Sequence, residues 1–159
     1  MTLQPGGPGP VGTGPGQEAL RILMLNWKDP ADRDAGGAER MVRRIAETWA
    51  AQGHQVDLFV PRRHQSRHDR IGGVTYIRRG NRITVFRTAL THLRRHVDDY
   101  DRVVESVSTR PFFSHEIVGG KATALYHQMA REIWDLEYRF PLSWAGRRIL
   151  EPRWVRRMA

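Results

Sequence analysis

The sequence contains no cysteine and no long apolar run, and each absence excludes a class of protein. Without cysteine, a disulfide framework and a thiolate metal site are both excluded. No apolar stretch approaches the roughly 20 residues that a membrane-spanning helix needs, and the N-terminus lacks the apolar centre of a signal peptide. These absences fit a reducing compartment, so we expect a cytoplasmic protein.

Lysine is also scarce, since Lys28 and Lys121 are the two in the chain, and arginine supplies nearly all the positive charge. The formal net charge of +9 keeps nucleic acid, an anionic membrane and a phosphorylated substrate open as partners. No nucleic-acid-binding motif is visible, and no expected strand face interleaves aromatic residues with arginines, so we do not expect nucleic acid. The length of 159 residues suits one domain with a proper core.

One stretch near the N-terminus organises the chain. Residues 20–25 have the composition and length of a strand, and apolar residues recur at helical spacing over 38–49. The polar loop between them, 26–37, closes on Gly36 and Gly37. In an open parallel sheet this loop lies at the carboxyl ends of the strands, where such folds bind ligands. We expect the two glycines and the helix start to face phosphate or sugar groups; the alternative is a tight turn that binds nothing.

Strands and helices alternate along the rest of the chain. This order predicts an α/β fold, a Rossmann-like, doubly wound and mainly parallel sheet flanked by helices. Residues 1–17 are mostly Gly and Pro, so we expect a disordered tail before a domain over 18–159. The further elements that we expect are strands at 55–60, 74–77, 101–106 and 121–127, a helix over about 84–96, a polar basic loop at 62–70 and a turn at 108–114.

The C-terminal part combines Trp144 and Trp154 with five arginines. This composition suits a helix that lies on an anionic membrane, which would place the protein at the inner membrane face. The same apolar residues could instead pack on the sheet or on another domain. We favour packing and keep the membrane surface as the alternative.

Four segments, in this order, carry a resemblance to a known family: GGAER, VVESVSTRPFFS, ALYHQMAREIW and FPLSWAGRRILEPRW. Together they resemble the N-terminal domain of glycosyltransferase family 4, whose members have the GT-B architecture of two Rossmann-like domains facing each other across a cleft. The resemblance covers roughly residues 20–158. It implies a retaining transfer of sugar from a nucleotide sugar, as co-substrate, to a hydroxyl of a glycan, lipid-linked or small-molecule acceptor, with no further cofactor.

The resemblance also implies a division of labour between two domains. The N-terminal domain carries the acceptor side, and the C-terminal domain, which we do not find in this sequence, holds most of the nucleotide sugar. We therefore expect half an enzyme that does not turn over alone. Glu39 and Glu47 have the spacing of the family's glutamate pair, but they lie on the expected first helix, so we regard the match as coincidence. The alternatives are a non-enzymatic basic module for a protein partner or an anionic membrane and, less favoured, a flavodoxin-like or response-regulator-like domain.

Individual site residues follow from the same resemblance. His127 ends the last expected strand, where many members place a histidine close to the transferred sugar, so we assign it the catalytic role. Arg131 and Glu132 follow in the same loop, and Arg110 ends the strand before. We expect these three to bind substrate or donor together with the glycine pair. A structural histidine and surface arginines are the alternatives.

Three pairs of side chains have the spacing of partial metal sites. Each pair lacks an evident third ligand or the right fold context, so we expect no metal. We predict a solvated loop for the aspartates and exposed faces for the histidines. The pairs are Asp32 and Asp34, His64 and His68, and His92 and His96.

Overall fold

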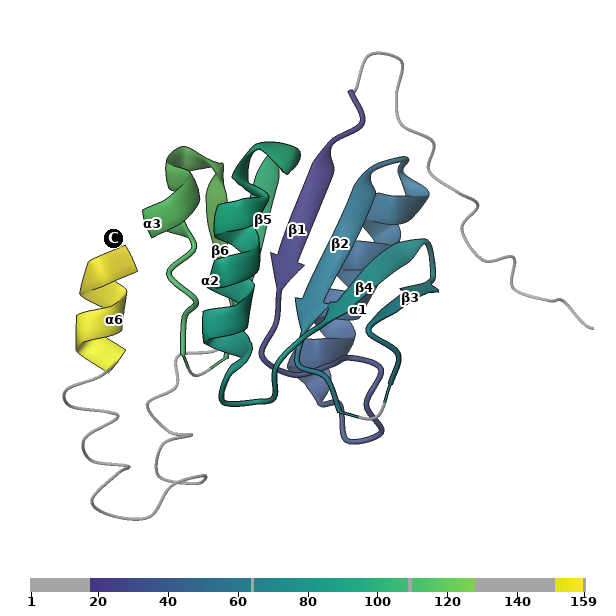
Figure 1. The fold of residues 1–159 in the computed structure, drawn as a ribbon, viewed down its shortest axis with the longest axis horizontal. Coiled ribbons are helices and arrows are strands. Elements are labelled where there is room, and N and C mark those ends of the chain that lie inside the picture. The colour runs from purple at the N-terminus through teal and green to yellow at the C-terminus, as the bar shows by residue number, and fades with distance from the viewer. Residues whose placement is uncertain (1–17, 64, 109, 128–150, 159) are drawn as a thin grey trace, which may run out of the picture.

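A six-stranded sheet forms the centre of the computed structural model, which describes residues 18–63, 65–108, 110–127 and 151–158 (Figure 1). The strand order is β3-β4-β2-β1-β5-β6. The expected tail over 1–17 lies outside the described residues. The strands are β1 (Arg21–Leu25), β2 (Gln55–Val60), β3 (His68–Ile71), β4 (Val74–Arg78), β5 (Arg102–Val107) and β6 (Ala122–Tyr126). The helices are α1 (Gly37–Ala51), α2 (Val85–Arg95), α3 (His115–Val118) and α6 (Glu151–Met158), with 3-10 turns η1 (Val97–Asp99) and η2 (Gly119–Lys121).

The sheet is parallel except at one edge, which confirms the expected α/β, Rossmann-like fold. β1 pairs in parallel with both β2 and β5, so Leu23 lies between Asp57 and Val103. β3 pairs antiparallel with β4. The expectation of a loop over 62–70 is wrong for its last residues, because β3 begins at His68. This edge strand exposes His68 and Arg70 and therefore lacks the apolar alternation that marks a strand.

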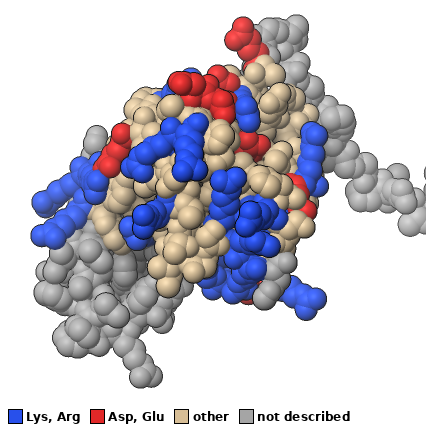
Figure 2. All heavy atoms as spheres, in the orientation of Figure 1, with Lys and Arg blue, Asp and Glu red and all other residues tan. Residues whose placement is uncertain are grey.

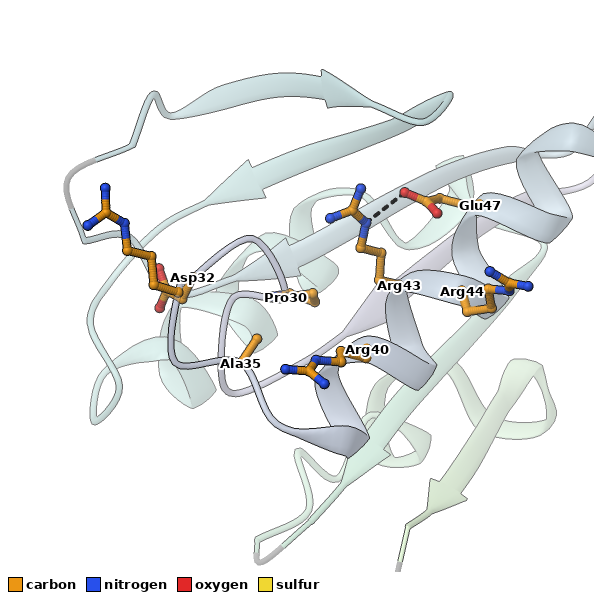
Figure 3. Close-up of a pocket in the computed structure, with 8 residues that line it drawn as sticks. Pro30, Asp32, Ala35, Arg40, Arg43, Arg44 and Glu47 are labelled. Carbon is orange, nitrogen blue, oxygen red and sulfur yellow. Dashed lines mark hydrogen bonds and ion pairs between the residues drawn. The ribbon is translucent and has the colours of Figure 1, made fainter.

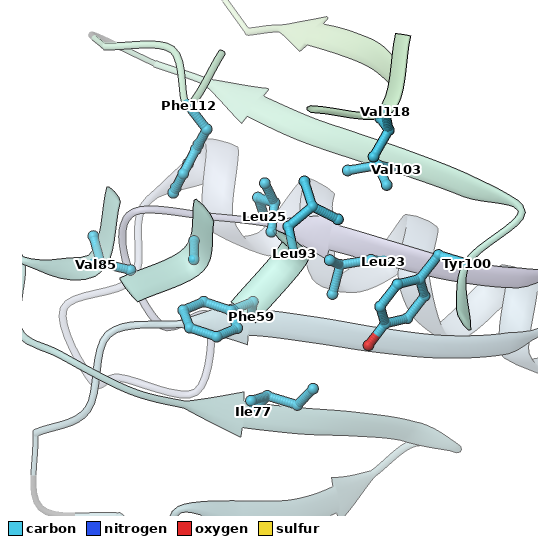
Figure 4. Close-up of a cluster of buried hydrophobic side chains, with 11 residues drawn as sticks. Leu23, Leu25, Phe59, Ile77, Val85, Leu93, Tyr100, Val103, Phe112 and Val118 are labelled. Atoms are coloured by element: carbon cyan, nitrogen blue, oxygen red, sulfur yellow. The ribbon is translucent and has the colours of Figure 1, made fainter. Parts of the chain in front are cut away.

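Apolar side chains on the two faces of the sheet make two separate cores. On β1, Leu23 and Leu25 face the α2 side, whereas Ile22 and Met24 face the α1 side. Figure 4 shows the α2-side cluster, in which the ring of Phe59 lies below Leu93. Burial on both faces explains why β1 reads as a continuous apolar run.

Each flanking helix contributes one apolar stripe to these cores. In α1 the residues fully buried are Val42 and Ala46, while Met41, which we placed in the apolar stripe, is 49% exposed. In α2 the buried stripe is Val85, Ala89 and Leu93, at successive spacings of four residues. The two helices therefore cover opposite faces of the sheet and leave its two ends open.

The described end of the C-terminal segment, α6, contacts α3. Arg157 forms an ion pair with Glu116, and its guanidinium lies 4.5 Å from the ring centroid of Phe113. No helix among the described residues is long and apolar enough to cross a membrane. The expected apolar residues over 128–150, including Trp144, lie outside the described residues.

Candidate functional site

The loop between β1 and α1 presents Gly36 and Gly37 to solvent at the carboxyl ends of the parallel strands, here called the carboxyl edge. The backbone N–H of Gly36 donates to Oε2 of Glu39 at 2.7 Å, which closes the first turn of α1. A Cβ at Gly36 would lie 3.0 Å from that oxygen, whereas one at Gly37 would meet open space. A side chain at Gly36 would therefore require the Glu39 carboxylate to shift slightly, and Gly37 leaves room for a ligand.

A buried ion pair anchors this loop to the sheet. Nε of Arg78, at the end of β4, lies 2.5 Å from Oδ2 of Asp29, and both side chains are almost completely buried. Nη1 of Arg78 also reaches Asp69 on β3 at 2.6 Å. We did not single out these residues in the sequence, because the partners Asp29 and Arg78 are 49 positions apart. The pair fixes where the loop leaves β1.

The two aspartates of the D-x-D pattern differ in environment, so the prediction of a solvated loop is wrong for one of them. Asp32 is only 8% exposed and accepts a hydrogen bond from Gln65 at 2.6 Å. Asp34 is exposed, and its hydrogen bond from Arg82 holds the pKa of its carboxyl below the usual value. Both carboxylates face cationic side chains, Asp32 the guanidinium of Arg63 and Asp34 those of Arg63 and Arg82. They hold the loop in place.

His127 follows β6 and lies at the same edge of the sheet as the glycines. Its Nε2 lies 2.9 Å from Oγ of Ser106, a buried residue of β5. Partial burial lowers the pKa of the imidazole, while the charge of Glu39 acts in the opposite direction. The carboxylate that closes the glycine turn is therefore close enough to act on His127, and burial keeps the ring neutral near pH 7.

Of the remaining expected site residues, Arg110 is described by the structure, and Arg131 and Glu132 are not. Arg110 is exposed at the carboxyl edge, where its guanidinium lies 4.7 Å from the ring centroid of Phe86. That stacking leaves the N–H groups at the rim of the guanidinium available to a ligand. Arg131 and Glu132 lie outside the described residues. Their roles, like those of His127 and Arg110, stay predictions.

Buried polar atoms without hydrogen-bond partners among the described residues also gather at the carboxyl edge. Buried polar groups are normally bonded, so such a group points to a partner that binds there. Asn26 comes directly after β1 and Ser108 directly after β5, a position that the sequence could have revealed. The atoms are Oδ1 of Asn26, Nε1 of Trp27, Nε of Arg82, Oε1 of Glu105 and Oγ of Ser108 and Ser114; Nδ1 of His92, at the other end of the sheet, also has no partner among the described residues.

The backbone after β5 carries the one left-handed residue other than glycine among those described, Phe113, with φ of 60°. Such a conformation is strained for an aromatic residue and is often found at functional sites. The next residue, Ser114, donates its N–H to Oε2 of the buried Glu105 at 2.8 Å. This loop is thus held in a fixed shape at the carboxyl edge, where we expected a simple turn around Pro111.

The opposite end of the sheet, the amino edge, contains His92, one of the histidines that we expected to be exposed. His92 is only 7% exposed, so that prediction is wrong for it, and its ring packs 5.3 Å from that of Phe59. Its Nε2 lies 3.3 Å from the hydroxyl of Tyr100, which donates to Asp57. Burial lowers the pKa of His92 to about 4. His92, Tyr100 and Asp57 line a cavity of about 560 Å³ at the amino edge.

His68, by contrast, is exposed as expected, and His64 lies outside the described residues. The His96 side chain is 42% exposed and pairs with Asp99 at 2.8 Å. Among the residues described, no group of three His, Cys, Asp or Glu side chains is arranged to hold a metal ion.

Charge is distributed unevenly between the two edges. Figure 2 shows acidic side chains gathered at the upper rim, where η1 contributes Asp98 and Asp99, and basic side chains across the middle and lower right. The arginines nearest the carboxyl edge include Arg62, Arg63 and Arg82. Arg63 and Arg82 are partly neutralised by their ion pairs with Asp32 and Asp34.

The chain matches a family model, Glycosyltransferase Family 4, over residues 35–159. That match covers more than half of the sequence. The chain belongs to glycosyltransferase family 4. It is also similar in structure to sucrose-phosphate synthase from Thermosynechococcus elongatus, with a TM-score of 0.54 and 18% identity.

The structural match bears on the fold of this family 4 domain. It covers 76% of this chain but 36% of the synthase, so the domain corresponds to about a third of that protein. At this identity the likeness establishes the fold, which is that of a Rossmann-like domain of a GT-B glycosyltransferase. No curated protein matches the sequence.

Proposed function

We propose that this family 4 domain is the acceptor-side half of a retaining glycosyltransferase, which moves a sugar from a nucleotide sugar to a hydroxyl. The observation that carries the proposal is that the exposed glycine turn and His127 lie at the same edge of the sheet, the carboxyl edge. The unmatched polar atoms of Asn26 and Ser108 at that edge support a polar ligand such as a sugar.

His127 would act as a neutral hydrogen-bonding group in this reaction. Burial lowers the pKa of its imidazole, so at neutral pH one ring nitrogen donates and the other accepts. Ser106 engages Nε2 at 2.9 Å and thereby fixes the ring, which leaves Nδ1 for a sugar hydroxyl. We assign His127 to binding and orienting the reacting sugar.

The glycine turn would stabilise the departing phosphate. The first N–H groups of a helix have no partner within the helix, and the helix dipole favours negative charge there. α1 begins at Gly37, where no side chain blocks an approaching phosphate. Arg110 and, outside the described residues, Arg131 and Glu132 would complete the binding of substrate and donor.

Turnover would require a second, donor-binding domain on the other side of the cleft. The test is transfer of labelled sugar from a panel of nucleotide sugars to hydroxyl acceptors, by this chain alone and by this chain fused to a family 4 donor-binding domain. We expect turnover only in the fusion, with the anomeric configuration of the donor retained in the product. Failure of every fusion, or an inverted product, would contradict the proposal and favour a basic binding module.

Attachment to a membrane is a separate proposal about the arginine-rich C-terminal segment. Arg153 and Arg156 of α6 are exposed, which supports contact with anionic headgroups. Salt-sensitive binding to anionic vesicles, lost on replacing both by Gln, is the expected result. Vesicle binding that is unchanged by salt and by these substitutions would contradict attachment through α6.

A further inference from the structure

A second cavity lies between α1 and the loop that precedes it, and its lining does not include Gly36, Gly37 or His127. Its volume of about 430 Å³ is that of a site for a small ligand. Figure 3 shows Arg40, Arg43 and Arg44 projecting from α1 and Pro30 and Ala35 on the loop that faces them. The lining residues are Pro30, Asp32, Arg33, Ala35, Arg40, Arg43, Arg44 and Glu47, and we call this cavity the arginine pocket.

Positive charge in the arginine pocket is only partly neutralised. Nε of Arg43 lies 2.7 Å from Oε1 of Glu47, so this guanidinium has its own carboxylate. For Arg33, Arg40 and Arg44, no described side chain supplies an ion pair. Three guanidinium groups around one cavity therefore have unused N–H donors.

The other carboxylate of the pocket, Asp32, does not compensate for them. It accepts a hydrogen bond from Gln65 at 2.6 Å and faces Nε of Arg63 at 3.6 Å, and neither partner lines the cavity. The charge of the Asp32 carboxylate is therefore largely compensated by residues outside the cavity. An anion is the ligand that this surplus of positive charge favours.

The spacing of these arginines destabilises the helix unless an anion binds between their guanidinium groups. Arg40 and Arg44 are four residues apart, so they lie on one face of α1, where like charges destabilise a helix. No acidic residue of the described chain relieves that pair. A bound anion would do so, and planar guanidinium groups match a phosphate in a bidentate geometry.

The loop wall of the pocket is held in place before any ligand arrives. Asp29, next to Pro30, is fixed by the buried ion pair with Arg78. Asp34, next to Ala35, is held by Arg82 at 2.8 Å. A preformed wall lowers the entropic cost of binding.

We propose that the arginine pocket binds the phosphate group of a phosphate-bearing ligand, on residues other than Gly36, Gly37 and His127. The chemistry is shared by soluble phosphate esters and by phospholipid headgroups. The inference rests on the charges and the cavity and is independent of the proposed glycosyl transfer.

The test is a titration of the 159-residue chain with pyrophosphate, and separately with vesicles of phosphatidylglycerol or of neutral phosphatidylcholine. The test variant is Arg40→Gln/Arg44→Gln. The matched control is Arg87→Gln/Arg95→Gln, which removes the same charge from exposed positions of α2. All four side chains are exposed, so both variants should fold.

We expect saturable binding that weakens at least tenfold in the test variant and less than twofold in the control. Saturation by pyrophosphate would identify a soluble ligand, and binding to phosphatidylglycerol vesicles alone would identify a headgroup; either supports the pocket if the test variant loses it. Absence of binding in both arms, or equal losses in the two variants, would overturn the proposal.

Discussion

The carboxyl edge and the amino edge of the sheet carry similar polar side chains, but these side chains have different roles. At the carboxyl edge, loops between strands hold glycines, an exposed arginine and buried polar atoms without partners among the described residues. At the amino edge, Tyr100 donates to Asp57 and lies beside His92, so most polar groups there satisfy one another. We propose that the first edge receives a ligand, whereas at the second edge the ring of His92 packs against that of Phe59 in the core.

The difference shows that burial of charge does not by itself mark a site. Arg78 and Asp29 are among the most buried charged residues described, yet they neutralise each other and anchor a loop. The atoms that point to a ligand are buried polar atoms without a partner among the described residues, such as Oδ1 of Asn26. Parallel strands bring such residues together because all their carboxyl ends meet at one edge.

Breaking the ion pair between Arg78 and Asp29, which anchors the loop at the carboxyl edge, should have the largest effect on stability. Arg78→Met leaves the Asp29 carboxylate buried without its cation, so we expect the free energy of unfolding to fall by about 3–5 kcal/mol. Urea denaturation measures it, with Arg79→Gln at the exposed neighbouring position as the control. A loss below about 1 kcal/mol in Arg78→Met would show that the pair does not anchor the loop.

The amino edge should control the response to acid. His92 has a pKa of about 4 when folded and about 6.5 when unfolded, so between these values the unfolded chain binds the extra proton. Stability should therefore fall as pH drops from 6.5 toward 4, by about 3 kcal/mol at most, since one pKa unit is about 1.4 kcal/mol.

Thermal or urea unfolding at a series of pH values measures how steeply the free energy of unfolding falls with pH. His92→Leu should flatten it, whereas His68→Gln, at an exposed site, should leave it unchanged. An equal slope in the wild type and His92→Leu would place the acid response elsewhere in the molecule.

At the carboxyl edge, His127→Ala should act on turnover rather than on folding. In the fusion with a donor-binding domain we expect the rate to fall by about 100-fold, the scale of one positioned catalytic group. The midpoint of unfolding should stay close to that of the wild type, because His127 is only partly buried. Unchanged turnover would remove His127 from the site.

The smallest expected effect concerns the link between the glycine turn and His127. Glu39→Gln removes the charge that raises the pKa of His127, so that pKa should fall further, as measured by NMR titration of the imidazole. The weaker acceptor for the Gly36 N–H should also cost about 1 kcal/mol of stability. A pKa that does not move would mean that the two groups are not coupled.

Local patterns in the sequence were sufficient for the fold. The apolar run of β1, the loop that closes on Gly36 and Gly37 and the helical period of α1 each depend on neighbouring residues, and the order of strands and helices along the chain implied a parallel sheet. The common edge of Gly36 and His127 followed from that order alone. The limits of β5 and β6 shifted by a residue or so, as expected for element ends.

Long-range partners decided what the sequence could not reveal. The polar edge strand β3 is defined by its pairing with β4 and has no apolar period of its own. His92 and Asp32 are buried because residues distant in sequence pack beside them, Phe59 beside His92 and Arg63 beside Asp32. The residues around His92 and Asp32 in the sequence have the composition of an exposed surface, so the sequence predicts an exposed position for both.

The most direct test of the account is an NMR titration of the isotopically labelled 159-residue chain with nucleotide sugars and hydroxyl acceptors. We predict saturable shifts in the backbone resonances of Asn26, Gly36 and Gly37 and in the ring of His127, with Tyr100 at the amino edge unmoved. Saturable shifts confined to the amino edge would contradict the assignment of the site to the carboxyl edge.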